Sequence, residues 1–158
     1  MIFNAEEIFQ MAIQIERNGV EFYSKASQVV KNEKVRHVLE FLAQSEVEHE
    51  KIFSRMKEQF LEQHAVLEQF DPDGDTARYL QAMASGHIFD LTNDPAESMT
   101  GNETERDVLM EALKREKDSI VFYMGMKDMV TQSVGKDHVE RIIKEEMRHV
   151  NIISKYLS

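Results

Sequence analysis

Six residues with metal-binding side chains form two copies of one pattern in this sequence, separated by 100 positions. Each copy contains a glutamate, a second glutamate thirty positions later, and a histidine three positions after that. The residues are Glu16, Glu46 and His49 in the first copy and Glu116, Glu146 and His149 in the second. Four carboxylates and two imidazoles are a complete ligand set for two metal ions. We therefore interpret the pattern as a candidate dinuclear metal site.

The sequences around the two copies are also alike. Phe22-Tyr23 in the first half corresponds to Phe122-Tyr123 in the second, and Ala12 corresponds to Ala112. This internal repeat indicates that the two halves of the chain fold in the same way.

The spacing of apolar residues is helical along most of the chain. Apolar residues recur three and four positions apart, and the chain has only two prolines and six glycines. We predict four long helices, at about residues 5–30, 34–64, 102–130 and 137–156, with a turn at residues 131–136 before the last. Asn4 with Glu7, and Asn102 with Glu105, have the spacing of capping boxes at the starts of the first and third helices.

A different kind of sequence separates the two helix pairs. Residues 70–75 and 93–95 are rich in turn-forming residues, and residues 76–85 between them suit a short helix. We expect residues 65–102 to form a long crossover between two antiparallel helix hairpins, at about 5–64 and 103–157. This predicts an all-α, ferritin-like four-helix bundle that forms a single domain over residues 1–158.

All four glutamates of the pattern fall on the apolar stripes of their helices. The neighbours of Glu16 on its helix face are Phe9, Ala12, Ile13, Gly19, Val20 and Tyr23. An isolated carboxylate in a low-dielectric interior costs on the order of 20 kcal/mol in the idealised limit. No lysine or arginine shares these stripes at matching positions in both halves, so bound cations are the expected compensation. Surface glutamates and a chance Glu-x-x-His are the simpler explanation, but two copies on apolar stripes disfavour it.

The six spacings resemble those of the rubrerythrin-like branch of the ferritin-like di-iron carboxylate proteins. The resemblance implies two iron ions, with manganese or zinc as alternatives. It implies that Glu16 and Glu116 are terminal or chelating ligands, one to each metal. It also implies that Glu46 and Glu146 bridge the metals, and that His49 and His149 bind one metal each. It also makes Tyr23 and Tyr123 candidates to hydrogen-bond the ligand carboxylates; equally, they could be ordinary core aromatics.

The sequence departs from rubrerythrins proper at two points. Their additional glutamate, one turn after the third-helix ligand, is replaced by Ser119, and Gly19 is its repeat counterpart. They also carry a rubredoxin domain whose iron is held by four cysteines, whereas this chain has no cysteine. Any electrons must therefore come from a separate electron-donor protein.

These features together predict a di-iron oxidoreductase that acts on peroxide or dioxygen, by peroxide reduction or ferroxidase-type oxidation of Fe(II). Two alternatives stay open: an iron-binding or storage protein with little turnover, and a structural bundle with an unused metal site. The storage protein would bind more than two irons per chain. The structural bundle would be stabilised by removal of a buried glutamate.

Composition limits the partners. A formal net charge of −10 disfavours nucleic acids and anionic membrane surfaces. No apolar run approaches the length of a membrane span, and Glu6 and Glu7 interrupt the region where a signal peptide would have its apolar core. We expect a cytoplasmic protein, and the family resemblance implies a homodimer.

Overall fold

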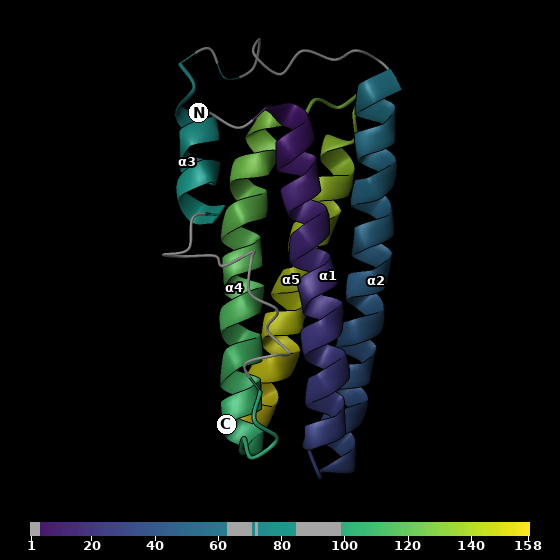
Figure 1. The fold of residues 1–158 in the computed structure, drawn as a ribbon, viewed down its shortest axis with the longest axis vertical. Coiled ribbons are helices and arrows are strands. Elements are labelled where there is room, and N and C mark those ends of the chain that lie inside the picture. The colour runs from purple at the N-terminus through teal and green to yellow at the C-terminus, as the bar shows by residue number, and fades with distance from the viewer. Residues whose placement is uncertain (1–3, 63–70, 72, 85–98) are drawn as a thin grey trace.

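The computed structural model describes residues 4–62, 71, 73–84 and 99–158. These residues form five helices and no strands: α1 (Ala5–Val29), α2 (Glu33–Glu62), α3 (Asp75–Ala84), α4 (Glu105–Met129) and α5 (Lys136–Leu157). The four long helices run side by side as a bundle, and the short α3 lies against the outside of α4 (Figure 1). The predicted all-α, ferritin-like four-helix bundle is confirmed.

The first helix begins where its capping box predicts. Asn4 Oδ1 accepts a hydrogen bond of 2.9 Å from the backbone N–H of Glu7, whose carboxylate accepts one of 2.8 Å from the N–H of Asn4. The two bonds satisfy N–H groups that have no partner inside the helix. The same arrangement fixes the entry of the chain into the bundle.

The predicted cap of the third long helix is wrong. Thr104 and Asp107 form its capping box, and α4 begins at Glu105 rather than near Asn102. The reason is a local turn that competes with the helix. The Glu103 carboxylate accepts hydrogen bonds from the N–H groups of Thr100 and Gly101, and Gly101 has a φ of +88°. The chain is therefore still turning at residue 102.

The other predicted boundaries fall close to the observed ones, within the part of the chain that is described. The short helix predicted at 76–85 is α3, at Asp75–Ala84. The predicted end of the second helix at His64, the turn at 93–95 and most of the crossover lie outside the described residues.

The helices pack more extensively within each hairpin than between the two hairpins. α1 packs mainly on α2 and α4 packs mainly on α5, and the two hairpins meet through α1 with α4 and α2 with α5. A turn at residues 130–135 joins α4 to α5, and Gly135 adopts a φ of +114° that favours glycine. α3 packs closely on α4 at Gly125, where the absence of a side chain leaves room for the ring of Tyr79. A Cβ at this position would lie 2.6 Å from that ring.

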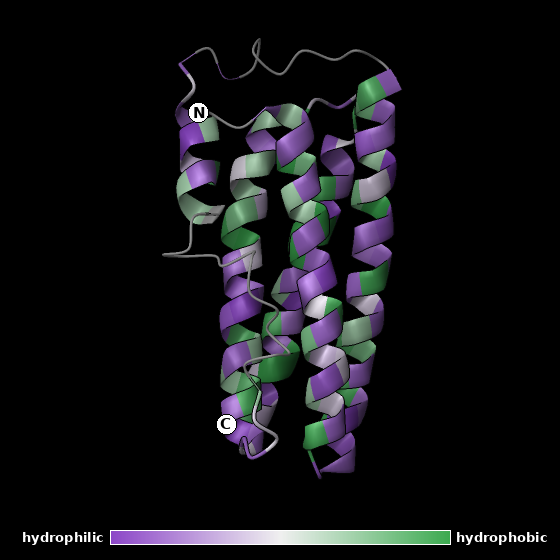
Figure 2. Ribbon diagram, viewed as in Figure 1, coloured by the Kyte–Doolittle hydropathy of each residue, from purple (hydrophilic) through white to green (hydrophobic). Residues whose placement is uncertain are grey.

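Hydrophobic and hydrophilic residues are interspersed along every long helix (Figure 2), and apolar residues three and four positions apart form the buried face of each amphipathic helix. The buried apolar residues divide into two clusters. One cluster surrounds Phe9, Phe53 and Val139, and the other surrounds Phe22, Leu39 and Leu109. The first joins the start of α1 to the end of α2, and the second joins the end of α1 to the start of α2. The middle turns of the bundle lie between them. Within the described residues, no helix has the length and apolar character of a membrane span.

Candidate metal centre

The six residues of the repeated pattern all lie in the buried middle of the bundle. Each comes from one of the four long helices, and none exposes more than 5% of its surface. The helix faces predicted from the sequence therefore bring these side chains together, although the two copies are 100 positions apart. That these six residues bind metal ions stays a prediction.

The side chains form two overlapping groups, each able to hold a metal ion. Within each group, one ligand atom from every residue lies within 4.8 Å of the others. The first group is Glu16, Glu46, His49 and Glu146, and the second is Glu46, Glu116, Glu146 and His149. Glu46 and Glu146 belong to both groups. A carboxylate that belongs to both groups has two oxygens and could contact a metal ion in each, so bridging stays a prediction for these two residues.

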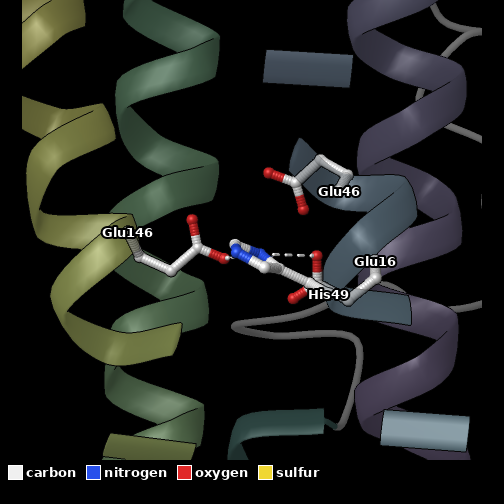
Figure 3. A group of neighbouring side chains, drawn as sticks. All are labelled: Glu16, Glu46, His49 and Glu146. Atoms are coloured by element: carbon white, nitrogen blue, oxygen red, sulfur yellow. Dashed lines mark ion pairs between the residues drawn. The ribbon is translucent and has the colours of Figure 1, made fainter. Parts of the chain in front are cut away.

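Figure 3 shows the first group. Glu146 reaches from α5 toward the ring of His49, and Glu16 lies on the other side of that ring. His49 Nδ1 is 3.2 Å from Glu146 Oε1 and 3.5 Å from Glu16 Oε2, without a well-directed hydrogen bond to either. The ring thus directs Nδ1 at two carboxylates of its own group.

In the second group, the histidine also faces two carboxylates, but one of them lies on its own helix. His149 Nδ1 is 2.9 Å from Glu146 Oε2 and 3.4 Å from Glu116 Oε1. The two imidazole rings lie face to face, with centroids 5.8 Å apart and an interplanar angle of 21°. Both histidines therefore present Nδ1 to the same cluster of carboxylates.

Two tyrosines link the hairpins across the centre. The Tyr23 hydroxyl donates a 2.6 Å hydrogen bond to Glu116 Oε1, and the Tyr123 hydroxyl donates one to Glu16 Oε1. Burial, followed by the charge of the carboxylates, raises the pKa of both hydroxyls, so they remain donors. Each tyrosine thus orients the first glutamate of the opposite half, while any part in the chemistry stays a prediction.

The histidines carry protons readily in the metal-free chain. Burial alone would lower their pKa values, but the neighbouring carboxylates outweigh it. The nearby negatively charged carboxylates of Glu146 and Glu16 raise the pKa of His49 to about 11. Glu116 and Glu146 raise the pKa of His149 to about 9. Metal binding through Nδ1 must therefore displace protons.

The carboxylates divide into two kinds. Burial, together with the charge of Glu146, raises the pKa values of Glu46 and Glu116 well above their usual range. Burial by itself would raise the pKa of Glu146, but its contacts with Glu116, His149 and His49 lower this pKa below the usual range. In the metal-free cluster, bound protons therefore supply the positive charge that metal ions would otherwise supply.

Unsatisfied atoms provide a test of whether these residues fit a metal. Glu16 Oε2, His49 Nδ1 and Glu146 Oε1 are buried and lack a hydrogen-bond partner among the described residues. They are also the atoms that face one another at 3.2 and 3.5 Å in the first group. Buried polar atoms without partners are costly, and a cation among these three would satisfy all of them. The donor set of carboxylate oxygens and imidazole nitrogens fits iron or manganese.

Sequence reasoning missed two residues that shape the centre. A Cβ on Gly19 would lie 3.0 Å from Glu46 Oε2, so this glycine leaves room for the Glu46 carboxylate. Glu145 Oε2 accepts a 2.7 Å hydrogen bond from His49 Nε2. The position of Gly19, one turn after Glu16, was a signal for the first. The only sequence signal for Glu145 was its position next to Glu146.

Comparison with known families agrees with this geometry. The family model for Rubrerythrin matches residues 7–157, which is nearly the whole chain. The chain therefore belongs to the rubrerythrin family. Comparisons with curated proteins and with solved structures returned no match.

Proposed function

We propose that this protein is a di-iron carboxylate oxidoreductase that acts on peroxide or dioxygen and is re-reduced by an external donor. The observation that carries the proposal is the pair of overlapping ligand groups, which share Glu46 and Glu146 and are buried between two apolar clusters. Membership of the rubrerythrin family supports the same type of centre.

The chain would hold the two metals through all six residues of the pattern. Glu16 and Glu116 would each bind one metal, and the shared Glu46 and Glu146 would bind both. His49 and His149 would each add one nitrogen through Nδ1. Iron is the proposed metal because an oxygen-rich set with one imidazole per ion suits it, although manganese or zinc can compete for such sites.

Two ferrous ions held together would supply two electrons to one oxidant, which would avoid the release of a one-electron radical. The chain's own residues prepare the site for this. Tyr23 and Tyr123 fix the orientation of Glu116 and Glu16 through their hydroxyl groups. The apolar clusters on either side exclude water, which strengthens electrostatic interactions inside the site.

The proposal also assigns two partners. The chain has no cysteine to hold a rubredoxin-type iron, so a separate protein would donate the electrons. A homodimer is proposed from the family alone.

Stopped-flow oxidation of the Fe(II)-loaded protein tests this function. The anaerobic protein, loaded with about two Fe(II) per chain, is mixed with H2O2 or with O2 under a radical trap. We expect oxidation of about two Fe(II) per H2O2, faster than for free Fe(II) at equal concentration, with no trapped hydroxyl radical. A Glu46→Ala/Glu146→Ala double variant should lose the rate advantage.

Oxidation no faster than that of free Fe(II), or trapped radical equal to that in the free-ion reaction, would refute the proposal. Continued uptake of iron well beyond two per chain would instead identify a storage protein.

A further inference from the structure

Besides the two tyrosines, Glu145 contacts a candidate ligand directly from outside the ligand groups. His49 is held from two sides: Nδ1 faces Glu146 and Glu16, while Nε2 donates a 2.7 Å hydrogen bond to Glu145 Oε2. Glu145 lies on α5 and His49 on α2, so this bond crosses between the hairpins. The other oxygen of Glu145 is 3.5 Å from Arg141 Nε, and the carboxylate is 31% exposed.

The other half of the centre lacks this arrangement. The repeat counterpart of Glu145 is Ser45, whose hydroxyl donates a 3.1 Å hydrogen bond to the carbonyl oxygen of Phe41 on its own helix. The edge-on ring of Phe41 lies beside His149, with centroids 6.1 Å apart. Among the described residues, the hydrogen bond of His149 is made through Nδ1 alone.

The unsatisfied atoms follow the same asymmetry. Of the three buried ligand atoms without a partner, those of Glu16 and His49 belong to the first group alone, and that of Glu146 belongs to both groups. In the second group, His149 Nδ1 is already within 2.9 Å of Glu146 Oε2. A cation at the first position would therefore satisfy more buried atoms and displace fewer existing contacts.

We propose that Glu145 is a positioning residue, which holds the Nε2–H of His49 so that Nδ1 faces the metal and thereby makes the His49 position the tighter of the two. This rests on the proposed di-metal function. A carboxylate on the outer nitrogen of a metal-bound histidine fixes the ring and its tautomer and makes the ligand more basic. Loss of such a partner typically costs about 10- to 100-fold in metal affinity. The two metal positions are thus chemically unequal, although the ligands repeat.

Titration calorimetry of the metal-free full chain with Co²⁺ measures this directly. We expect two binding steps for the wild type. Glu145→Ala should weaken the tighter step by about 10- to 100-fold and leave the weaker step within a factor of about three. Glu145→Gln keeps a hydrogen-bond acceptor without the charge, so it should recover part of the loss. Glu48→Ala removes an exposed carboxylate of α2 that bonds Lys51, and it controls for the change in net charge.

A second measurement separates positioning from a general structural effect. In the Zn²⁺-loaded protein, NMR of the histidine rings should show His49 with a slowly exchanging, downfield Nε2–H proton. Glu145→Ala should remove that protection and leave the His149 signals and the circular dichroism spectrum unchanged.

The outcomes are distinct. If the wild type binds two metals but Glu145→Ala matches Glu48→Ala in both steps, the inference is refuted and the proposed function stands. Equal weakening of both steps also refutes it, because the asymmetry is absent. If the wild type fails to bind two metals, the proposed function fails first, and the inference fails with it.

Discussion

Tyr23 on α1 donates a 2.6 Å hydrogen bond to Glu116 on α4, and Tyr123 on α4 donates its own to Glu16 on α1. The two bonds are repeat counterparts and connect the hairpins twice through fully buried groups. Hydrogen bonds to charged or strongly polarised carboxyl groups in such surroundings are stronger than neutral ones. This reciprocal pair therefore both orients two candidate ligands and holds the halves of the bundle together.

Tyr23→Phe and Tyr123→Phe should each lower the free energy of unfolding of the metal-free protein by about 1.5–3 kcal/mol. The ring and its packing are kept, but a buried carboxyl oxygen loses its donor. Urea unfolding measures the loss. Tyr79→Phe is the matched control, because it removes a hydroxyl that bonds the carbonyl oxygen of Val121 at a more exposed site. Its expected cost is about 0.5 kcal/mol. Equal costs for all three variants would contradict the special role of the buried pair.

Gly19→Ala should have opposite effects on stability and on metal binding. Alanine favours a helix interior over glycine by about 0.5–1 kcal/mol, and the flexible Glu46 side chain can move aside in the metal-free protein. The metal-bound protein fixes that carboxylate, which a Cβ at 3.0 Å then displaces. We expect an unchanged or higher urea midpoint and an approximately tenfold loss of Co²⁺ affinity.

Ser119→Ala is the repeat-matched control for Gly19→Ala. The Ser119 hydroxyl bonds the carbonyl oxygen of Arg115 on its own helix. Its removal should leave Co²⁺ affinity unchanged. Unchanged affinity in Gly19→Ala as well would show that the glycine is not needed for the position of Glu46.

The metal-free protein should lose stability as the pH rises above about 6.5. The folded-state pKa values of His49 and His149 are raised from 6.5 to about 11 and about 9. Their contribution is fully present below pH 6.5, and it is lost as the pH rises through 9 and then 11, because the native state binds more protons than the unfolded state there. The raised pKa values of Glu46 and Glu116 act in the same direction, and their part of the loss begins already above about pH 4.5. Urea midpoints across this range measure the loss.

Metal affinity should change in the opposite sense over the same pH range. Each proton displaced from a histidine makes the apparent affinity rise by up to about tenfold per pH unit. Calorimetry in buffers of different ionisation enthalpy counts the protons released. At pH 7.5, both histidines of the metal-free protein should still carry the proton that a metal would displace. Binding of Co²⁺ without proton release at this pH would contradict the assignment of both imidazoles as ligands.

Features set by local spacing were accessible from the sequence. A 3.6-residue period places Glu46 and His49 on one face of a helix, and the apolar neighbours of Glu16 identify that face as buried. The repeat then predicts the matching positions in the second half. The family match supports the centre as a whole, but it does not assign ligand roles to individual residues.

Features set by competition or by distant contacts were not accessible. Asn102 and Glu105 had the correct spacing for a cap, but the turn made by Glu103 displaced the helix start. Glu145 looks like an ordinary surface acid on its own helix, and only the docking of α5 against α2 brings it to His49. The asymmetry between the two halves therefore depends on tertiary packing.

The most direct test of the central claim is metal stoichiometry by elemental analysis, after anaerobic loading with Fe²⁺ and desalting. The account predicts about two irons per chain in the wild type and a loss of nearly all iron in Glu46→Ala/Glu146→Ala, since these carboxylates are shared by both ligand groups. Glu48→Ala should retain about two. A wild type without iron, or a double variant with the same iron content as the wild type, would contradict the dinuclear centre.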